Sequence, residues 1–318
     1  MNYIVLDLEW NQSSDGKAHL NKVFPCEIVE IGAVKLNADF EITDQFSEII
    51  APSIYKEMNR ITKELIHLDM EQLSKGRSFP EVIREFFDWC GKDYIFCTWG
   101  MMDLTELQRN MKYYDIKSSI GYPVKYFDVQ KLFSINYEDR KTRRSLEFAI
   151  DYLNIDKEEQ FHRAGSDAYY TARIFQLLDR EVLNNYSIDY YHNPRNKQEE
   201  IYAVFDTYSK FISREFENKE AVLKDKDVSS TRCYKCGRPA RRLIRWFSTN
   251  NKIYYCQAVC VRHGYLKGKI RIKKAENGNL FAVKTLKLVK KEEAGKIKER
   301  QEQMRIKRRM HKKIKKEK

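Results

Sequence analysis

The fold of this chain is decided by the stretch YIVLDLE at Tyr3–Glu9, an apolar and partly β-branched run that ends in two carboxylates. Such a run is typical of a buried strand. Because alternate side chains of a strand share a face, we expect Asp7 and Glu9 to lie side by side at its end. Two carboxylates so close repel each other unless a cation neutralises them, and Mg²⁺ or Mn²⁺ suits oxygen ligands. A solvated strand end without metal is the alternative for this pair taken alone.

The segments after this strand predict an α/β domain. Glu27–Leu36 and Phe40–Ile50 read as two strands that a short turn joins. One more short strand and a series of helices follow, at Arg60–Leu68, Phe79–Cys90, Tyr94–Thr98 (the strand), Asp103–Tyr114, Val129–Ser134, Ser145–Leu153 and Ala164–Leu183. Three strands followed by alternating helices and strands favour a mixed sheet flanked by helices.

Two further acidic residues lie where helices are expected to begin. Asp103 follows the strand Tyr94–Thr98, and Asp167 follows His162 by five residues. Taken alone, Asp103 is a helix cap and Asp167 is a first-turn acid that the helix dipole favours. His162, taken alone, is a loop histidine.

The order and spacing of five residues resemble the three exonuclease motifs of the DEDDh branch of the DnaQ-like (RNase H-like) 3′–5′ exonuclease superfamily, namely Asp7, Glu9, Asp103, His162 and Asp167. The stretches 24–33, 99–107 and 126–133 resemble the second strand, the second motif and the approach to the third motif of that family. The resemblance covers about residues 1–185. It is closest to the branch of the histone-mRNA and small-RNA 3′ exonucleases and the KapD-like proteins. It implies an RNase H-like fold.

The resemblance also implies a chemistry, the two-metal hydrolysis of a terminal phosphodiester. Asp7 would bridge two Mg²⁺ or Mn²⁺ ions, Glu9 and Asp167 would complete the ligands of the first, and Asp103 would serve the second. His162 would take the proton from the attacking water, since imidazole titrates near neutral pH. The expected substrate is the 3′ end of a single-stranded nucleic acid, RNA in preference to DNA because this branch trims RNA. The expected products are nucleoside 5′-monophosphates.

One residue departs from the family pattern. Many members have Thr directly after the first motif's Glu, near the 3′ end of the substrate, whereas this chain has Trp10. Its ring is suited to stack on a terminal base. Packing beneath the neighbouring loop is the alternative, and the sequence leaves both open.

Charge divides the chain into two parts. Residues 232–318 hold 29 Lys and Arg against 6 Asp and Glu, whereas residues 1–231 carry a net charge of −10. A basic extension on an acidic body favours a polyanionic partner, nucleic acid first and an anionic membrane surface second.

Composition indicates the compartment. No apolar run approaches the ~20 residues that span a bilayer, and the short apolar start, interrupted by Asp7, is not typical of a secretory signal. An odd number of cysteines, seven, in a chain of this kind favours reduced thiols. We therefore expect a cytoplasmic protein without a membrane partner, and the sequence does not indicate a protein partner.

A second group of metal-ligating residues follows residue 231. Cys233 and Cys236 form a C-x-x-C turn, and Cys260 with His263 repeats that spacing, each pair being followed by Gly. This pattern resembles a zinc ribbon, which holds one structural Zn²⁺ through four ligands. Cys256 is the alternative ligand, paired with Cys260, and reduced cysteines without metal are the second alternative.

These features predict four segments. They are an exonuclease domain at 1–185, a helical connector at 186–231 with a helix over Gln198–Glu217, a zinc-ribbon-like basic module at 232–289 and a Lys/Arg-rich tail at 290–318. Within the module, cations and a ring suggest contacts with single-stranded nucleic acid at Arg241, Arg242, Arg245 and Trp246. A merely solvated basic face is the alternative. For the whole chain, the competing hypothesis is a non-catalytic protein that keeps the fold and binds nucleic acid or ribosomes.

Overall fold

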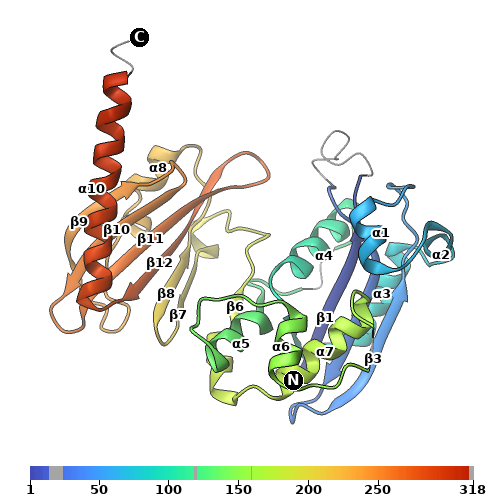
Figure 1. Cartoon of the computed structure of the whole chain (residues 1–318). Helices are drawn as coiled ribbons and strands as arrows, with labels where there is room; N and C mark the ends of the chain where they lie inside the picture. Colours follow the sequence, from blue (N-terminus) through green and yellow to red (C-terminus); the bar gives the residue numbers. More distant parts are fainter. Residues whose placement is uncertain (14–23, 118–119, 159, 315–318) are drawn as a thin grey trace. The chain divides into compact units, whose positions relative to one another are not determined.

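The computed structural model describes residues 1–13, 24–117, 120–158 and 160–314, so the last four residues of the predicted tail lie outside it. The chain divides into two compact units, Met1–Tyr191 and His192–Lys318 (Figure 1). No helix within these described ranges is long and apolar enough to cross a bilayer.

The first unit is built on a mixed sheet, as the sequence predicts. Its described strands have the order β3-β2-β1-β4-β5-β6. They are β1 (Asn2–Asn11), β2 (Glu27–Leu36), β3 (Ile42–Ile49), β4 (Tyr94–Thr98), β5 (Lys125–Asp128) and β6 (Ser187–Ile188). Strand β1 is antiparallel to β2 and parallel to β4. The predicted α/β fold class is therefore confirmed, and the strand of the opening stretch lies inside the sheet.

Helices cover both faces of this sheet (Figure 1). They are α1 (Arg60–Ile66), α2 (Met70–Ser74), α3 (Phe79–Cys90), α4 (Met102–Tyr113), α5 (Val129–Tyr137), α6 (Leu146–Tyr152) and α7 (Ala164–Gln176). Ile4, Leu6 and Leu8 of β1 pack in one cluster with residues of α3 and α4. Val5 packs in the other cluster with residues of α5, α6 and α7. The alternation of β1 thus assigns its odd-numbered side chains to the face that carries α7.

The second unit is an antiparallel sheet. Its described strands have the order β7-β8-β12-β11-β10-β9. They are β7 (Ile201–Val204), β8 (Tyr208–Ile212), β9 (Arg241–Ser248), β10 (Ile253–Cys260), β11 (Gly264–Lys274) and β12 (Leu280–Leu288). On one face, Val222 of α8 (Lys219–Lys224) and Val228 of α9 (Lys226–Ser229) pack with Ile270.

The helix predicted over Gln198–Glu217 is wrong, because these residues form β7 and β8. Their apolar residues fit helical spacing, but Ile201 and Ala203 are buried while Tyr202 and Val204 are exposed, which is the alternation of a strand. The partner that decides the matter is distant in sequence, since Ile212 of β8 pairs with Val283 of β12. The residues predicted as a connector therefore supply two strands of the second sheet.

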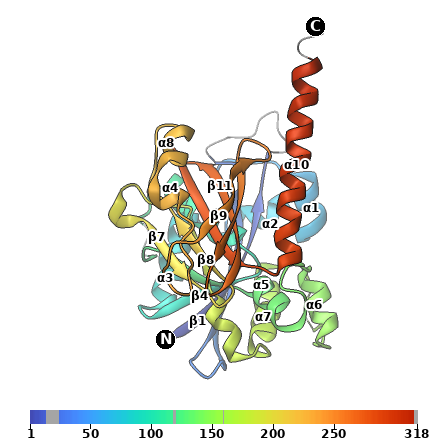
Figure 2. The ribbon, with the colours of Figure 1, turned by 90° about the vertical axis from the view of Figure 1, so that its left-hand side faces the viewer.

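The basic tail begins as a docked helix, α10 (Lys291–Ile314). Ile297 is buried against Ile244 and Phe247. Glu293 near its start pairs with Lys267 of β11 at 3.0 Å. Figures 1 and 2 show the helix running beside the sheet and extending beyond it. The first part of the tail thus belongs to the core of the second unit.

Candidate active site and metal centre

Strand β1 carries the first two acidic residues into the first unit. Asp7 and Glu9 lie on the face that carries α7, each opposite a residue of β2: Gly32 faces Asp7 and Glu30 faces Glu9. The alternation of side chains along the strand therefore puts both carboxylates on one face, as the sequence predicts.

The glycine opposite Asp7 lets α7 approach the sheet. A Cβ atom at Gly32 would lie 2.1 Å from the backbone carbonyl carbon of Ala164, the first residue of α7. Any larger residue would push the helix away. The start of α7, with His162 before it and Asp167 in its first turn, therefore lies directly against β2.

Three of the predicted residues converge at this point. One ligand atom each from Glu9, His162 and Asp167 lies within 4.8 Å of the others. The backbone N–H of His162 donates to Asp167 Oδ2 at 3.3 Å, and His162 itself is exposed with a left-handed backbone (φ 62°). Asp103, in the first turn of α4, is buried.

Burial and mutual repulsion raise the pKa values of these acids. Burial, followed by the charges of Asp103, Asp167, Glu9 and Glu30, holds the pKa of Asp7 well above its usual range. Burial raises the pKa of Glu9 to about 8, that of Asp103 to about 7 and that of Asp167 to about 6. The acids are thus close enough for their charges to interact, and without a cation the cluster tends to retain protons at neutral pH.

The cluster fits divalent cations. Asp167 Oδ1 is buried and has no hydrogen-bond partner among the described residues. A buried carboxylate oxygen without a donor is costly unless a cation approaches it. Hard oxygen ligands grouped in this way are what Mg²⁺ and Mn²⁺ prefer.

One charged residue beside the acidic cluster, Glu30, was not among the predicted site residues. Glu30 is 1% exposed and accepts from Arg163, which follows His162, through Nε (3.0 and 3.1 Å) and Nη2 (2.9 Å). The pair joins β2 to the residue before α7. The signal available in the sequence was an acid inside an apolar strand, since buried acids need a partner.

Trp10 lies on the other side of β1 from the carboxylates. It is half-buried against the cluster of Ile4, Leu6 and Leu8. The register of β1 with β2 shifts between Glu9 and Trp10. This position favours the packing alternative, and stacking of Trp10 on a terminal base stays a prediction.

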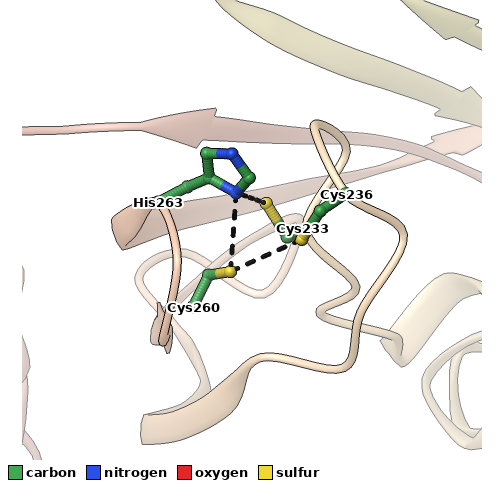
Figure 3. Close-up of side chains that lie close together, drawn as sticks. All are labelled: Cys233, Cys236, Cys260 and His263. Atoms are coloured by element: carbon green, nitrogen blue, oxygen red, sulfur yellow. Dashed lines mark hydrogen bonds between the residues drawn. The ribbon is translucent and has the colours of Figure 1, made fainter.

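The second unit brings four predicted metal ligands together (Figure 3). The distances are 3.6 Å from Cys233 Sγ to His263 Nδ1, 3.7 Å from Cys236 Sγ to Cys260 Sγ, and 3.8 Å from Cys260 Sγ to His263 Nδ1. Ligands at tetrahedral zinc would be separated by about 3.8 Å for two sulfurs and about 3.6 Å for sulfur and nitrogen, given the usual bond lengths. The four atoms are thus spaced as the ligands of one Zn²⁺ are.

The charge state of Cys260 agrees with this spacing. Burial raises the pKa of its thiol, but hydrogen bonds with His263 and with the N–H of Arg262 outweigh burial and bring that pKa to about 6. A thiol that ionises near neutral pH is a ready metal ligand.

The alternative ligand Cys256 lies outside this group. Its side chain is buried on β10 and packs against Gly268, as the Trp246 ring does. A Cβ at Gly268 would lie 2.4 Å from Cys256 Sγ and 2.6 Å from the Trp246 ring. Burial raises the pKa of this thiol to about 12. Cys256 is therefore a core residue.

The predicted nucleic-acid contacts divide into two groups. Arg241, Arg242 and Arg245 are exposed along β9, so they stay candidates. Trp246 is half-buried in the cluster of Tyr254 and Ile270, and its indole N–H donates to Ser229 O at 2.9 Å. The prediction that Trp246 stacks on a base is therefore not supported by its position, because its ring already packs inside the unit.

Most of the first unit also matches known proteins in sequence. The family model described as RNase T exonuclease matches residues 4–175. The human protein named 3′-5′ exoribonuclease 1 is 24% identical over 165 residues, which are 48% of this chain and 46% of the human protein. The chain thus matches about half the length of this curated relative.

Solved structures that match this chain include two nuclease complexes. The nuclease domain of 3′hExo, described as a DEDDh family member bound to rAMP, is 20% identical with a TM-score of 0.49, covering 59% of this chain and 96% of that domain. E. coli exonuclease I in complex with a dT13 oligonucleotide is 12% identical with a TM-score of 0.45, covering 62% of this chain and 45% of that one.

Proposed function

Because the chain belongs to the RNase T exonuclease family, whose model matches residues 4–175, we propose that it is a metal-dependent 3′–5′ exonuclease of single-stranded nucleic acid. The observation that carries the proposal is the convergence of Glu9, His162 and Asp167 within 4.8 Å, beside a carboxylate oxygen that has no donor among the described residues. The exoribonuclease name of the human relative supports RNA as the preferred substrate.

The acids would hold two Mg²⁺ or Mn²⁺ ions. Asp7, on which the charges of the other acids act, would be a ligand of both ions, and Glu9 with Asp167 would complete one ion's protein ligands. Asp103 would serve the other. When bound, the two ions would lower the pKa of an attacking water and neutralise charge on the leaving 3′-oxygen.

His162 would accept the proton of the attacking water. Its side chain is exposed, and one of its ring nitrogens lies within 4.8 Å of a carboxylate oxygen of Glu9 and of Asp167, which supports this role. Histidine is the side chain that most often acts as a general base in catalysis. The products would be nucleoside 5′-monophosphates, released one at a time.

The second unit would hold one structural Zn²⁺ and bind the substrate's backbone. Cys233, Cys236, Cys260 and His263 would be the zinc ligands. The Lys and Arg excess of residues 232–318 would add affinity for phosphates without reading sequence. A purely binding function is disfavoured, because a cluster of buried acids repels nucleic acid and benefits a protein only through the cations it holds.

The nuclease proposal is tested with 5′-labelled single-stranded RNA and DNA of one sequence, in Mn²⁺, Mg²⁺ or EDTA. We expect a metal-dependent ladder that shortens from the 3′ end, faster on RNA. Asp167→Ala should abolish it, and His162→Ala should slow it about a hundredfold or more while metal still binds. The exposed acid Asp156 serves as the control, as Asp156→Ala should cleave normally. Digestion by Asp167→Ala at the parent rate would contradict the proposal.

The zinc proposal is tested by the metal content of the purified chain. We expect one zinc per chain, lost together with much of the second unit's thermal stability in Cys236→Ser, because structural zinc contributes folding free energy. Cys256→Ser is the matched control and should retain its zinc. Retention of zinc by Cys236→Ser, or its loss from Cys256→Ser, would show that the ligand set is wrong.

A further inference from the structure

A cavity of about 810 Å³ opens on the second sheet at its β7 edge. Its floor is a row of side chains across three strands. Tyr202 of β7 pairs with Phe211 of β8, which pairs with Lys284 of β12, so the three point to the same face. All three line the cavity. Its size falls within the ~300–1,000 Å³ typical of ligand sites.

Two walls rise from this floor. One is the start of α9, with Lys226 and Asp227, and the other is the turn of the first two zinc ligands, with Arg232 and Tyr234. Tyr234 lies between Cys233 and Cys236 in sequence and is 8% exposed. The proposed zinc would therefore hold one wall of the cavity in place.

An exposed aromatic ring offers a stacking surface. Tyr202 is 59% exposed, although it lies in a strand whose neighbouring residues Ile201 and Ala203 are buried. Its pairing with Phe211 keeps it on the cavity side of β7. An aromatic ring at a cavity mouth in a basic unit is suited to stack on a nucleobase, because every base presents a π face.

Cations surround this ring. Lys226 and Arg232 are exposed at the rim. Lys284 is 6% exposed, lies 5.1 Å from the Phe211 ring and donates to the carbonyl oxygens of Asp227 and Ser230. An ammonium has three N–H donors, so among the described residues one is left for a ligand. Burial lowers the pKa of Lys284 to about 8, which leaves it mostly charged at neutral pH. The acid of the lining, Asp227, is paired with Lys197 at 3.6 Å.

We propose that this cavity binds one nucleotide of a single-stranded nucleic acid, with the base against Tyr202 and its phosphate near Lys226 and Lys284. Three cations in an otherwise mostly apolar cavity favour a ligand that is both aromatic and anionic over a peptide added along the edge strand β7. The inference rests on the proposed nuclease function, for which it supplies a substrate contact in the second unit.

The test is the binding of a fluorescein-labelled single-stranded oligouridylate to the full chain, measured by fluorescence anisotropy. Asp167→Ala is the background, so that the probe is not digested. Tyr202→Ala should weaken binding about tenfold, and Tyr202→Phe should bind like the background chain, since stacking needs the ring and not the hydroxyl. Unchanged zinc content and circular dichroism show that each variant is folded.

Two nearby lysines distinguish binding in the cavity from general electrostatic attraction to the basic unit. Lys226→Gln and Lys224→Gln remove the same charge two residues apart, but Lys224 pairs with Glu220 at 2.7 Å and does not line the cavity. We expect Lys226→Gln to weaken binding several-fold more than Lys224→Gln. Equal losses in the two lysine variants, or parent affinity in Tyr202→Ala, would overturn the inference. Such results would fit the binding of a peptide along β7 instead.

Photo-crosslinking locates the bound base independently. With 4-thiouridine in the probe, we expect adducts on the peptides that contain Tyr202 or Tyr234, and their absence from both would also contradict the cavity. These outcomes are distinct from those of the nuclease assay. If the chain binds RNA in this cavity but does not shorten it, the cavity proposal stands and the nuclease proposal fails. If the chain shortens RNA without binding it in the cavity, the nuclease proposal stands and the cavity proposal fails.

Discussion

At the scale of single residues, an ion pair between Glu30 and Arg163 lies beside the acidic cluster. Glu30 faces Glu9 across the β1–β2 pair and is buried, so it would add to the repulsion if it stood alone. Arg163 binds it through two nitrogens and also lowers the pKa of Glu9. Because Arg163 directly follows His162, we expect the ion pair to help position the proposed base.

We predict that Arg163 acts as a positioning residue. Arg163→Ala leaves a buried carboxylate without its partner, which should cost about 3 kcal/mol or more of unfolding free energy. It should also lower kcat at temperatures where the variant is folded, with less effect on KM, because His162 loses its anchor. Arg163→Lys should restore part of kcat, since it keeps the charge but not the two-nitrogen geometry.

Thermal melts and steady-state kinetics check this prediction. Arg173→Ala is the control, because Arg173 is an exposed arginine on α7 that contacts Tyr169 and not Glu30. Parent kcat in folded Arg163→Ala would mean that the ion pair serves stability alone.

At the scale of elements, the site depends on how closely α7 lies against β2. The strand supplies Gly32 opposite Asp7, and the helix supplies Asp167 in its first turn. Neither element forms the cluster by itself. The close approach at Gly32 is what brings carboxylates more than 150 residues apart in sequence within reach of one another.

We predict that Gly32→Ala disrupts both stability and activity. The new Cβ would collide with backbone, which cannot rotate away as a side chain can, so the cost should reach about 3 kcal/mol. Displacement of α7 should also reduce the nuclease rate at least about tenfold, because catalytic geometry tolerates little misplacement. Gly121→Ala, where a Cβ meets no atom within 4 Å, is the control for both measurements. Equal melting temperatures for the two variants would contradict the close contact.

At the scale of the whole molecule, the change in net charge along the chain and the boundary between the two units fall at different residues. The basic excess begins near residue 232, but the second unit begins at His192, because β7 and β8 pair with β12. A cut at the charge boundary would remove β12 and leave a hairpin without its partner strand. A cut after Tyr191 follows the contacts instead.

We therefore predict different outcomes for two truncations. Residues 1–191 should melt cooperatively and still shorten short oligonucleotides. They should bind long RNA more weakly and with a flatter dependence of log affinity on log salt, since fewer phosphates are neutralised. Residues 1–231 should expose β7 and β8 to limited proteolysis. Filter binding over a salt series checks the first expectation, and an unchanged salt slope in 1–191 would show that the second unit does not bind the substrate.

The sequence by itself determined the α/β class of the first unit, its central strand, the resemblance to the exonuclease family and the spacing of the two cysteine turns. These features depend on the order and spacing of residues that are close to one another in the sequence. It did not determine the strands β7 and β8, whose apolar spacing suits a helix equally well until β12 pairs with them. The sequence also did not determine whether Cys256 binds zinc, whether Trp246 stacks on a base, or which residue pairs with Glu30.

Only the tertiary structure decided the roles of those residues. Cys256 of β10 and Trp246 of β9 both pack against Gly268 of β11, and Glu30 meets Arg163, the residue before α7. In each case the deciding neighbour is at least ten residues away in sequence, so no local pattern encodes it. A side chain's chemistry follows from its type, but whether it binds metal, stacks on a base or packs in a core depends on what the fold places beside it.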